Sequence, residues 1–161
     1  MQIPSIQTLR EKFEYYPETG KLFRRYKNYS REVGLTLHNA RQEVTCHPWK
    51  GAKSAVCWAL HYGVWPSSIL DHADRDPTNN KINNLRPATA QQNSANASLS
   101  RLNSVGLKGV SFVKRLDKYS ATIKFNRKQI HLGVFDDPQE AAKVYQKKAV
   151  ELFGEYAAPH G

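Results

Sequence analysis

The sequence predicts an α+β protein made of two small units. Its 161 residues fit one ordinary domain or two small ones. Residues 69–99 have the pattern strand, long polar loop, strand and helix, and residues 109–154 have the pattern of three strands followed by an amphipathic helix. We therefore expect a first domain over residues 1–99, with its core at about 69–99, and a second over residues 100–161, with its core at about 104–157.

The amino-terminal part predicts a helix and a hairpin. Ser5 can cap a helix over residues 5–14. The segment at residues 16–20, YPETG, is typical of a tight turn between two strands. Residues 26–50 are polar and mixed, and we expect one or two strands there. The apolar side chains that would share one face of the helix are Ile6, Leu9 and Phe13.

Residues 53–62, KSAVCWALHY, predict a buried helix that ends at Gly63. His61 lies near the end of this helix, where we expect it to be capping or exposed rather than a metal ligand. The three tryptophans are expected in the core of the first domain, and they are Trp49, Trp58 and Trp65.

The most informative stretch is residues 70–93, LDHADRDPTNNKINNLRPATAQQN. Thr89 and Gln92 have the spacing of a capping box, so a helix should begin there. A strand, loop, strand and helix in this order would bring together polar residues that are far apart in the chain, namely Asp71, His72, Asn84 and Asn93. Asn79, Asn80 and Asn83 are expected to be loop and turn residues.

These residue types fit metal-assisted cleavage of a phosphodiester bond. The carboxylate of Asp71 and the amide oxygen of Asn93 are hard oxygen ligands that suit Mg²⁺. His72 can be the general base that activates water, because its ordinary pKa lies near neutrality.

This stretch resembles the HNH endonucleases, particularly the phage and intron homing type in which the last His is an Asn. Asn84 and Asn93 follow His72 by twelve and twenty-one residues. The resemblance implies that His72 is the general base, that Asn84 braces its loop, and that Asp71 and Asn93 hold Mg²⁺ or another divalent cation such as Mn²⁺. Arg86 is expected either to contact a phosphate or to be solvated. The His-Arg pair that relatives carry on the preceding helix is replaced by Ser54-Ala55.

The formal net charge of +10 predicts a polyanionic partner, most simply nucleic acid. The two cysteines form no C-x-x-C pair, so we expect neither zinc nor a disulfide framework. No apolar run has membrane length and no signal peptide is recognised. We expect a monomer with no membrane contact, in the reducing cytoplasm of a bacterial host and encoded by a phage or mobile element.

The carboxy-terminal part predicts a three-stranded antiparallel sheet packed on one helix. After a helix that runs to about residue 99 and a linker to about residue 104, the expected strands are Gly109–Phe112, Tyr119–Phe125 and Gln129–Phe135, with turns at residues 116–117 and 126–127. Asp137, Pro138 and Glu140 form a helix start. The apolar stripe of that helix is Ala142, Tyr145, Ala149, Leu152 and Phe153, and Gly154 ends it.

The motifs K-G-V, Y-S-A-T-I and H-L-G-x-F-D-D-P-x-E-A-A, over about residues 104–157, resemble the plant ethylene-response-factor (APETALA-type) DNA-binding domain. The resemblance implies that the sheet enters the major groove. Residues 101–135 contain eight basic side chains, of which Arg101 is the first, and a single acidic one, Asp117. The residues expected to contact DNA in this unit are Lys108, Ser111, Lys114, Arg115, Lys118, Thr122, Lys124, Arg127, Lys128, Gln129 and His131.

Three functions therefore remain open at this point. The first is a metal-dependent DNA endonuclease of the homing type that nicks double-stranded DNA. The second is a DNA-binding transcription regulator whose HNH unit is a catalytically silent scaffold. The third, based on charge alone, is an RNA-binding protein, which a groove-reading sheet disfavours because the A-form major groove is too narrow.

Overall fold

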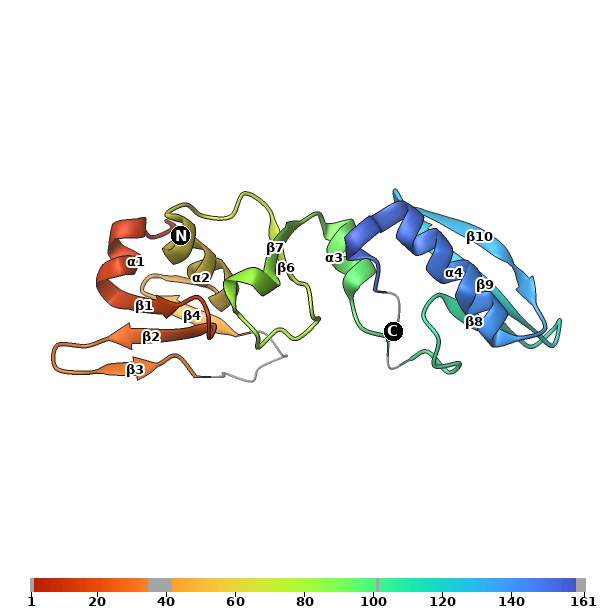
Figure 1. Ribbon diagram of the computed structural model, residues 1–161, viewed down its shortest axis with the longest axis horizontal. Helices are drawn as coiled ribbons and strands as arrows, with labels where there is room; N and C mark the ends of the chain where they lie inside the picture. Colours follow the sequence, from red (N-terminus) through yellow and green to blue (C-terminus); the bar gives the residue numbers. More distant parts are fainter. Residues whose placement is uncertain (1, 35–41, 101, 159–161) are drawn as a thin grey trace. The chain divides into compact units, whose positions relative to one another are not determined.

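The computed structural model describes residues 2–34, 42–100 and 102–158. Its helices and antiparallel sheets confirm the expected α+β class (Figure 1). Contacts divide the chain into two compact units, Met1–Ala88 and Thr89–Gly161. Residues 89–99, which the sequence placed with the first domain, thus pack with the second unit, because Ala95 joins its apolar core. Arg101, one of the expected basic residues, lies outside the described residues.

The first unit begins with helix α1, Ile6–Lys12, whose cap is Ser5 as expected. The Ser5 side chain accepts a hydrogen bond from the Thr8 backbone N–H at 3.1 Å. The helix is shorter than the expected 5–14, because Phe13 adopts extended backbone and begins strand β1, Phe13–Tyr16. Strand β1 pairs with β2, Lys21–Arg25, which pairs in turn with β3, Ser30–Glu32.

Two further strands precede the second helix. Strands β4, Glu43–Cys46, and β5, Trp49–Ala52, form an antiparallel pair. Together with β3, this places three strands where the sequence predicted one or two, since short strands of mixed polarity carry little periodic signal. Helix α2, Lys53–Tyr62, ends as expected at Gly63, which has a left-handed φ of 72°.

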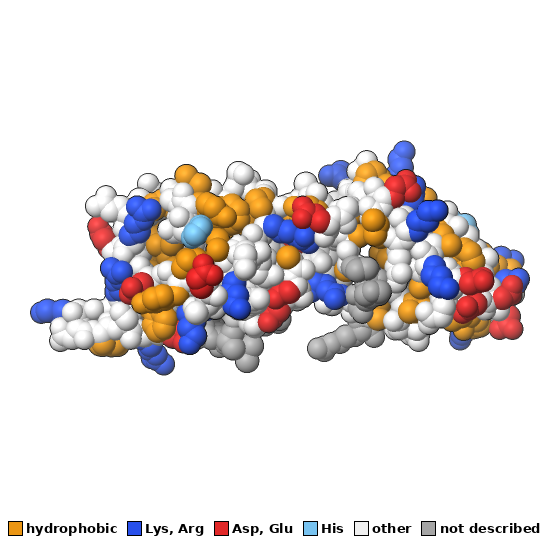
Figure 2. All heavy atoms as spheres, in the orientation of Figure 1, with side chains coloured by type: hydrophobic (Ala, Val, Ile, Leu, Met, Phe, Trp, Pro, Cys, Tyr) orange, Lys and Arg blue, Asp and Glu red, His pale blue; other side chains and the backbone are white. Residues whose placement is uncertain are grey.

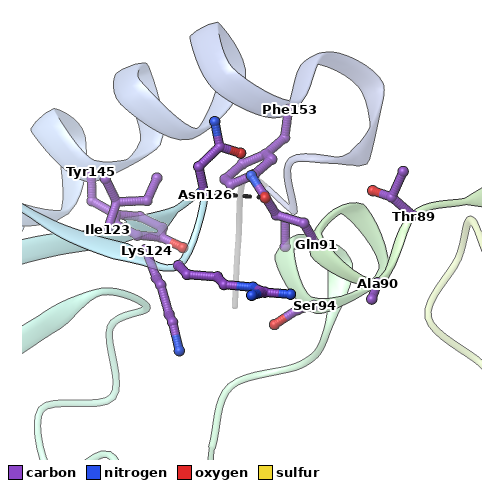
Figure 3. A pocket seen from close by; sticks show the side chains of 11 residues that line it. Thr89, Ala90, Gln91, Ser94, Ile123, Lys124, Asn126, Tyr145 and Phe153 are labelled. Carbon is purple, nitrogen blue, oxygen red and sulfur yellow. Dashed lines mark hydrogen bonds between the residues drawn. The ribbon is translucent and has the colours of Figure 1, made fainter.

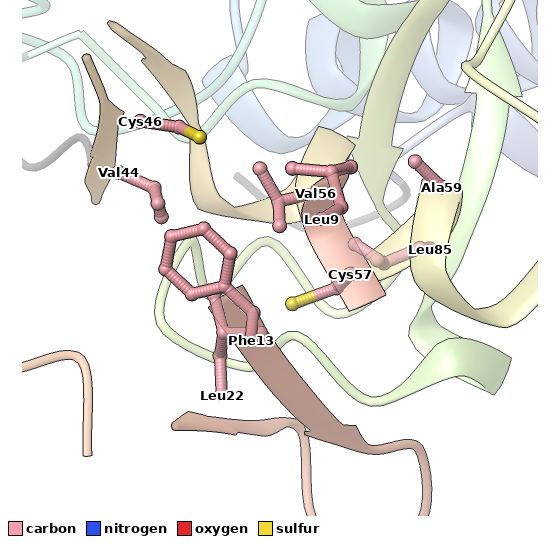
Figure 4. Packing of buried hydrophobic residues seen from close by; sticks show 9 residues of the cluster. All are labelled: Leu9, Phe13, Leu22, Val44, Cys46, Val56, Cys57, Ala59 and Leu85. Carbon is pink, nitrogen blue, oxygen red and sulfur yellow. The ribbon is translucent and has the colours of Figure 1, made fainter. Parts of the chain in front are cut away.

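The core of the first unit joins α1, α2 and the surrounding strands (Figure 4). Its nine buried apolar residues are Leu9, Phe13, Leu22, Val44, Cys46, Val56, Cys57, Ala59 and Leu85. Trp49, Trp58 and Trp65 pack against this cluster while partly buried, which confirms their expected place. His61 is exposed, also as expected.

The turn between β1 and β2 approaches a distant loop very closely. Gly20 has a φ of +72°, and a Cβ placed on it would lie 2.6 Å from the Lys81 backbone nitrogen and 2.7 Å from the Asn80 carbonyl carbon. Tyr15 reinforces the approach, because its hydroxyl donates to the Asn80 carbonyl oxygen at 2.6 Å. The amino-terminal hairpin therefore fixes the position of the loop that precedes β7.

Replacing Gly20 by alanine is expected to destabilise the first unit by at least about 1–2 kcal/mol, the cost of a side chain in the left-handed region. The clash with backbone atoms adds to this cost. Urea unfolding followed by tryptophan fluorescence measures the effect. The matched control is Gly34→Ala, because an added Cβ there meets no atom of the described residues within 4 Å. Equal stability of the two variants would contradict the close approach.

The last part of the first unit is a hairpin with a long connection. Strand β6, Ile69–His72, pairs antiparallel with β7, Leu85–Ala88. The connection ends in a short 3₁₀ helix, η1, Ile82–Asn84. Because the loop is long and polar, it depends on side-chain hydrogen bonds for its shape.

The second unit begins with helix α3, Ala90–Asn96. Thr89 and Gln92 form the expected capping box, in which each side chain accepts from the other residue's backbone N–H, at 2.8 and 3.2 Å. The helix ends at Asn96 instead of about residue 99. Lys108 donates from Nζ to the carbonyl oxygens of Ala95 and Ala97, which satisfies groups at the carboxyl end of the helix.

A three-stranded antiparallel sheet follows, in the order β10-β9-β8. The strands are β8, Val110–Val113, β9, Lys118–Phe125, and β10, Lys128–Phe135. Helix α4, Pro138–Phe153, lies along one face of this sheet, and the 3₁₀ helix η2, Gly154–Tyr156, follows it (Figure 1). The expected cap is confirmed, because the Asp137 side chain accepts from the Gln139 backbone N–H at 2.9 Å. None of the helices over residues 2–34, 42–100 and 102–158 is long and apolar enough to cross a membrane.

Candidate active site and nucleic-acid interface

The hairpin of β6 and β7 positions the expected acid and base. Asp71 and His72 are the last two residues of β6, and their partners across the ladder are Arg86 and Leu85. Asp71 is buried, with 4% of its surface exposed, and its Oδ2 accepts from Arg86 Nε at 2.9 Å. A buried carboxylate needs such a positive partner, because desolvation of an isolated charge is costly. Arg86 therefore holds Asp71, where the sequence left open a phosphate contact or a solvated side chain.

The side chain of Asn84 ties the two ends of the loop together. Its Oδ1 accepts from the Asp74 backbone N–H at 3.0 Å, and its Nδ2 donates to Asp74 Oδ1 and to the Asn79 carbonyl oxygen, both at 2.8 Å. Its carbonyl oxygen accepts from the Ala73 N–H at 2.9 Å. These bonds hold the chain directly after His72, and they fit the bracing role expected for Asn84.

Asp74 completes this network from the loop. Burial raises the pKa of its carboxyl group, but hydrogen bonds from Asn79, the Asp76 backbone and Asn84, with the nearby His72 charge, outweigh burial and lower the pKa below its ordinary value. The ionised form is thus the one that the loop stabilises. From the sequence, a loop-capping role is expected for Asp74 more than a metal contact, and its hydrogen bonds with the Asp76 backbone N–H and Asn79 Nδ2 confirm that role.

Asn80 is the residue of the site that sequence reasoning missed. We expected an ordinary turn residue, yet only 1% of its surface is exposed. Its Oδ1 lies 3.3 Å from His72 Nε2, and its Nδ2 donates to Gln42 Oε1 at 2.9 Å and to the Thr78 carbonyl oxygen at 3.1 Å. Gln42 is 38 residues away in the sequence, so no local sequence pattern could have predicted this contact.

Asn93, the second expected metal ligand, lies on α3 in the second unit. Its participation with Asp71 stays a prediction from the sequence. Among the described residues, no three His, Cys, Asp or Glu side chains gather into a group that could hold a metal ion. The expected donor set is of another kind, with one carboxylate and one amide oxygen, and it fits a Mg²⁺ ion that keeps several waters and binds phosphate.

Replacing Asn84 by alanine is expected to destabilise the first unit by about 1–3 kcal/mol, because the buried Asn84 amide makes three hydrogen bonds to Asp74 and Asn79 that are lost. The rate of DNA cleavage should also fall, because the loop after His72 loses the hydrogen bonds of Asn84. Urea unfolding and plasmid cleavage measure the two effects. Asn83→Ala is the matched control, because Asn83 lies beside Asn84 in η1 but is exposed. Identical behaviour of the two variants would contradict the bracing role.

In the second unit, the sheet presents one polar face. The ladder pairs Lys124 with Gln129 and Thr122 with His131. It also pairs Ser111 with Ser120, and the Ser120 hydroxyl lies 3.3 Å from His131 Nδ1. The alternate residues of β9, such as Ile123, are buried towards α4. Of the expected DNA-contacting residues, those on this polar face are Ser111, Lys118, Thr122, Lys124, Gln129 and His131.

The remaining expected contacts fall into two groups. Lys114 and Arg115 lie in the β8–β9 turn, and Arg127 and Lys128 lie at the β9–β10 turn, so all four are exposed at the ends of the strands. Lys108 does not lie on the polar face, because its Nζ binds carbonyl oxygens at the end of α3. Figure 2 shows Lys and Arg side chains over both units, with acidic side chains among them.

A cavity of about 520 Å³ lies within the second unit, between α3 and the sheet with its helix (Figure 3). Ile123, Tyr145 and Phe153 provide its apolar lining. Gln91 Oε1 accepts from the Asn126 backbone N–H at 3.3 Å at its edge, which links α3 to the β9–β10 turn. The cavity contains none of the expected catalytic residues of the first unit.

Comparison with known proteins supports the class of protein that this hairpin site defines. Residues 52–95 match the family described as HNH endonuclease. The chain is 39% identical over 99 residues to an uncharacterized HNH endonuclease of Acanthamoeba polyphaga mimivirus, a match that covers 61% of this chain and 50% of that protein. It is 32% identical over 101 residues to protein 3.8 of Escherichia phage T7, covering 62% of this chain and 83% of that protein.

Residues 52–95 therefore carry an HNH endonuclease domain, and the chain is related to proteins of two viruses. Its match spans only half the length of the mimivirus relative. No solved structure matches the chain. Ser54 and Ala55, which stand where the resemblance leads us to expect a His-Arg pair, lie half-buried in the first turn of α2.

Proposed function

We propose that this protein is a metal-dependent DNA endonuclease of the homing type that nicks one strand of double-stranded DNA as a monomer. The observation that carries the proposal is the placement of His72 at the end of β6, beside a buried, Arg-paired Asp71 and directly before a loop held by Asn84. The viral relatives support an origin in a phage or mobile element, acting in the cytoplasm of a bacterial host.

In this mechanism His72 takes a proton from a water molecule, whose oxygen attacks the phosphorus atom. The bond from phosphorus to the leaving sugar oxygen breaks, and that oxygen takes a proton from solvent. Asp71 and Asn93 would hold Mg²⁺ or Mn²⁺, which when bound polarises the phosphate and stabilises the leaving oxygen. Arg86 orients the Asp71 carboxylate through its hydrogen bond, and Asn84 keeps the loop after His72 in place.

The direct test is incubation of the purified protein with supercoiled plasmid at low salt, with Mg²⁺ or with EDTA. We expect open-circular product with Mg²⁺ and none with EDTA. Linear product at the earliest times would show that the protein cuts both strands instead of nicking one. Product formed equally in EDTA would contradict the metal-dependent mechanism.

We further propose that residues 104–157 form an ethylene-response-factor-like domain that docks duplex DNA against its sheet. The support is the polar sheet face, which carries basic and amide side chains on adjacent strands while α4 packs on the other side. Such a face supplies cations for phosphates and polar groups for base edges.

The Lys124→Ala variant tests this docking through salt dependence. If Lys124 neutralises one phosphate, the slope of log Kd against log salt should fall by about 0.9. Fluorescence anisotropy of a labelled duplex measures the slope. Lys147→Ala is the control, because Lys147 is exposed on α4, away from the strands. Equal loss of slope in the two variants would contradict a specific role for the sheet face.

The alternative of a transcription regulator with a silent HNH scaffold rests on the same sheet face. It predicts tight duplex binding without any metal-dependent product. A supercoiled substrate bound on a mobility-shift gel, but not cut at any Mg²⁺ or Mn²⁺ concentration, would favour it.

A further inference from the structure

Asn80 is buried beside the proposed general base by contacts from two distant parts of the first unit, the β1–β2 hairpin and Gln42, and from its near neighbour Thr78. Its carbonyl oxygen accepts from the Tyr15 hydroxyl at 2.6 Å, and its amide binds Gln42 and the Thr78 carbonyl. Gly20 packs against the Asn80–Lys81 peptide. The side chain of Asn80 is therefore fixed in position before any substrate arrives.

The orientation of the Asn80 amide follows from these partners. The Thr78 oxygen is a backbone carbonyl, which can only accept a hydrogen bond, so the atom 3.1 Å from it must be the Asn80 nitrogen. The second donor of that nitrogen is directed to Gln42 Oε1 at 2.9 Å. The remaining atom, Oδ1, consequently faces His72 Nε2 at 3.3 Å.

An amide oxygen at Nε2 selects one form of the imidazole. Because Oδ1 can only accept, Nε2 must carry a proton to make the bond. In the neutral ring the lone pair is then on Nδ1. After a proton has been taken up at Nδ1, Nε2 still carries its hydrogen, so the same bond serves the imidazolium form.

We propose that Asn80, oriented by Gln42 and the Thr78 carbonyl, is a positioning residue that holds His72 in its Nε2–H tautomer and makes Nδ1 the atom that takes the proton from water. The catalytic consequence rests on the proposed endonuclease function, whereas the hydrogen bond itself does not. In the step, one water O–H proton moves to Nδ1, and the water oxygen forms the new bond to phosphorus.

The experiment is nuclear magnetic resonance of metal-free protein with ¹⁵N-labelled histidine at pH 8. His72→Ala assigns the His72 ring signals. In the wild-type protein we expect the ring proton on Nε2, protected enough from exchange to give a one-bond proton–nitrogen signal. In Asn80→Ala that signal should be lost, whereas Asn83→Ala, which changes an exposed neighbour, should retain it. A His72 proton on Nδ1 in the wild type would overturn the proposal.

If the Asn80→Ala variant does not fold, a second variant still tests the proposal. Backbone amide spectra establish whether that variant folds, and Gln42→Ala is the second variant, since it removes an orienting acceptor without touching His72. We expect Gln42→Ala to accelerate exchange of the Nε2 proton. If Asn80→Ala folds and its Nε2 proton exchanges at the wild-type rate, the proposal is overturned. If Asn80→Ala is unfolded, a wild-type exchange rate in Gln42→Ala overturns it.

Single-turnover cleavage supplies the catalytic readout. Asn80→Ala should lower the cleavage rate by about 10–100-fold, by analogy with the loss on removing the hydrogen-bond partner of a metal-ligating imidazole. Its Kd for duplex DNA should stay within about twofold, because the proposed role lies in proton transfer rather than binding. If the wild-type protein does not cleave but shows the protected Nε2–H signal, the proposed function fails and the hydrogen bond stands. If the wild type cleaves and the signal of Asn80→Ala equals that of the wild type, only the positioning role fails.

Discussion

Replacing His72 by alanine is expected to lower the rate of plasmid nicking by about 10²–10⁴-fold, the contribution of a positioned general base. His72 ends β6 beside Asp71, and its ring contacts Asn80, so the substitution removes the group that we propose accepts the proton of water. Single-turnover cleavage of supercoiled plasmid with Mg²⁺ measures the loss. Duplex affinity, measured by anisotropy, should remain near that of the wild type.

The matched control is His61→Ala, which removes an exposed histidine from α2 in the same unit. It should cleave at the wild-type rate. If His72→Ala lost duplex binding as strongly as cleavage, His72 would be a structural residue and the general-base role would fail. If it cleaved as fast as the control, another group would have to activate the water.

Replacing Phe13 by alanine is expected to destabilise the first unit by about 3–5 kcal/mol, through lost burial and the cavity left behind. Phe13 is 1% exposed at the start of β1, in the cluster that joins α1, β2, β4 and α2 (Figure 4). Arg24 also lies over its ring, 5.0 Å from the centroid. Because a small domain is only marginally stable, a loss of this size leaves the unit largely unfolded on mild heating.

Urea unfolding followed by tryptophan fluorescence measures this effect selectively. All three tryptophans, Trp49, Trp58 and Trp65, lie in the first unit, so the signal reports that unit alone. Phe112→Ala is the control, because Phe112 is 41% exposed on β8 of the second unit. It should leave the tryptophan transition unchanged. A Phe13→Ala midpoint equal to the control would contradict the central place of Phe13 in the core.

Local sequence signals predicted most of the helix ends and turns. The caps at Ser5, Thr89 and Asp137 are confirmed, because a side-chain oxygen and the backbone N–H groups of the next residues are neighbours along the chain. The expected turn at residues 126–127 is also confirmed, with Asn126 and Arg127 both at positive φ. The boundaries of helices and strands were predicted less well, since Phe13 was expected in the first helix and instead begins strand β1.

The candidate site could likewise be predicted from the sequence only in part. The spacing of Asp71, His72 and Asn84 was sufficient to predict a hairpin site, and the structure places the three on β6 and at the end of its loop. The role of Arg86 required the β6–β7 register, which sets it opposite Asp71. Asn80 had no signal of its own, because one asparagine in a turn looks like any other until its burial is known.

The sequence by itself determined the α+β class, the HNH motif and the basic character of the carboxy-terminal strands, since each depends on neighbours in the chain or on composition. The tertiary structure alone decided which asparagine faces His72, which side chain holds Asp71, and that Lys108 supports α3 instead of joining the polar sheet face. The physical reason is that these contacts join strands and loops that only folding brings together. A buried polar group must take its hydrogen bonds from whatever partners the fold places beside it.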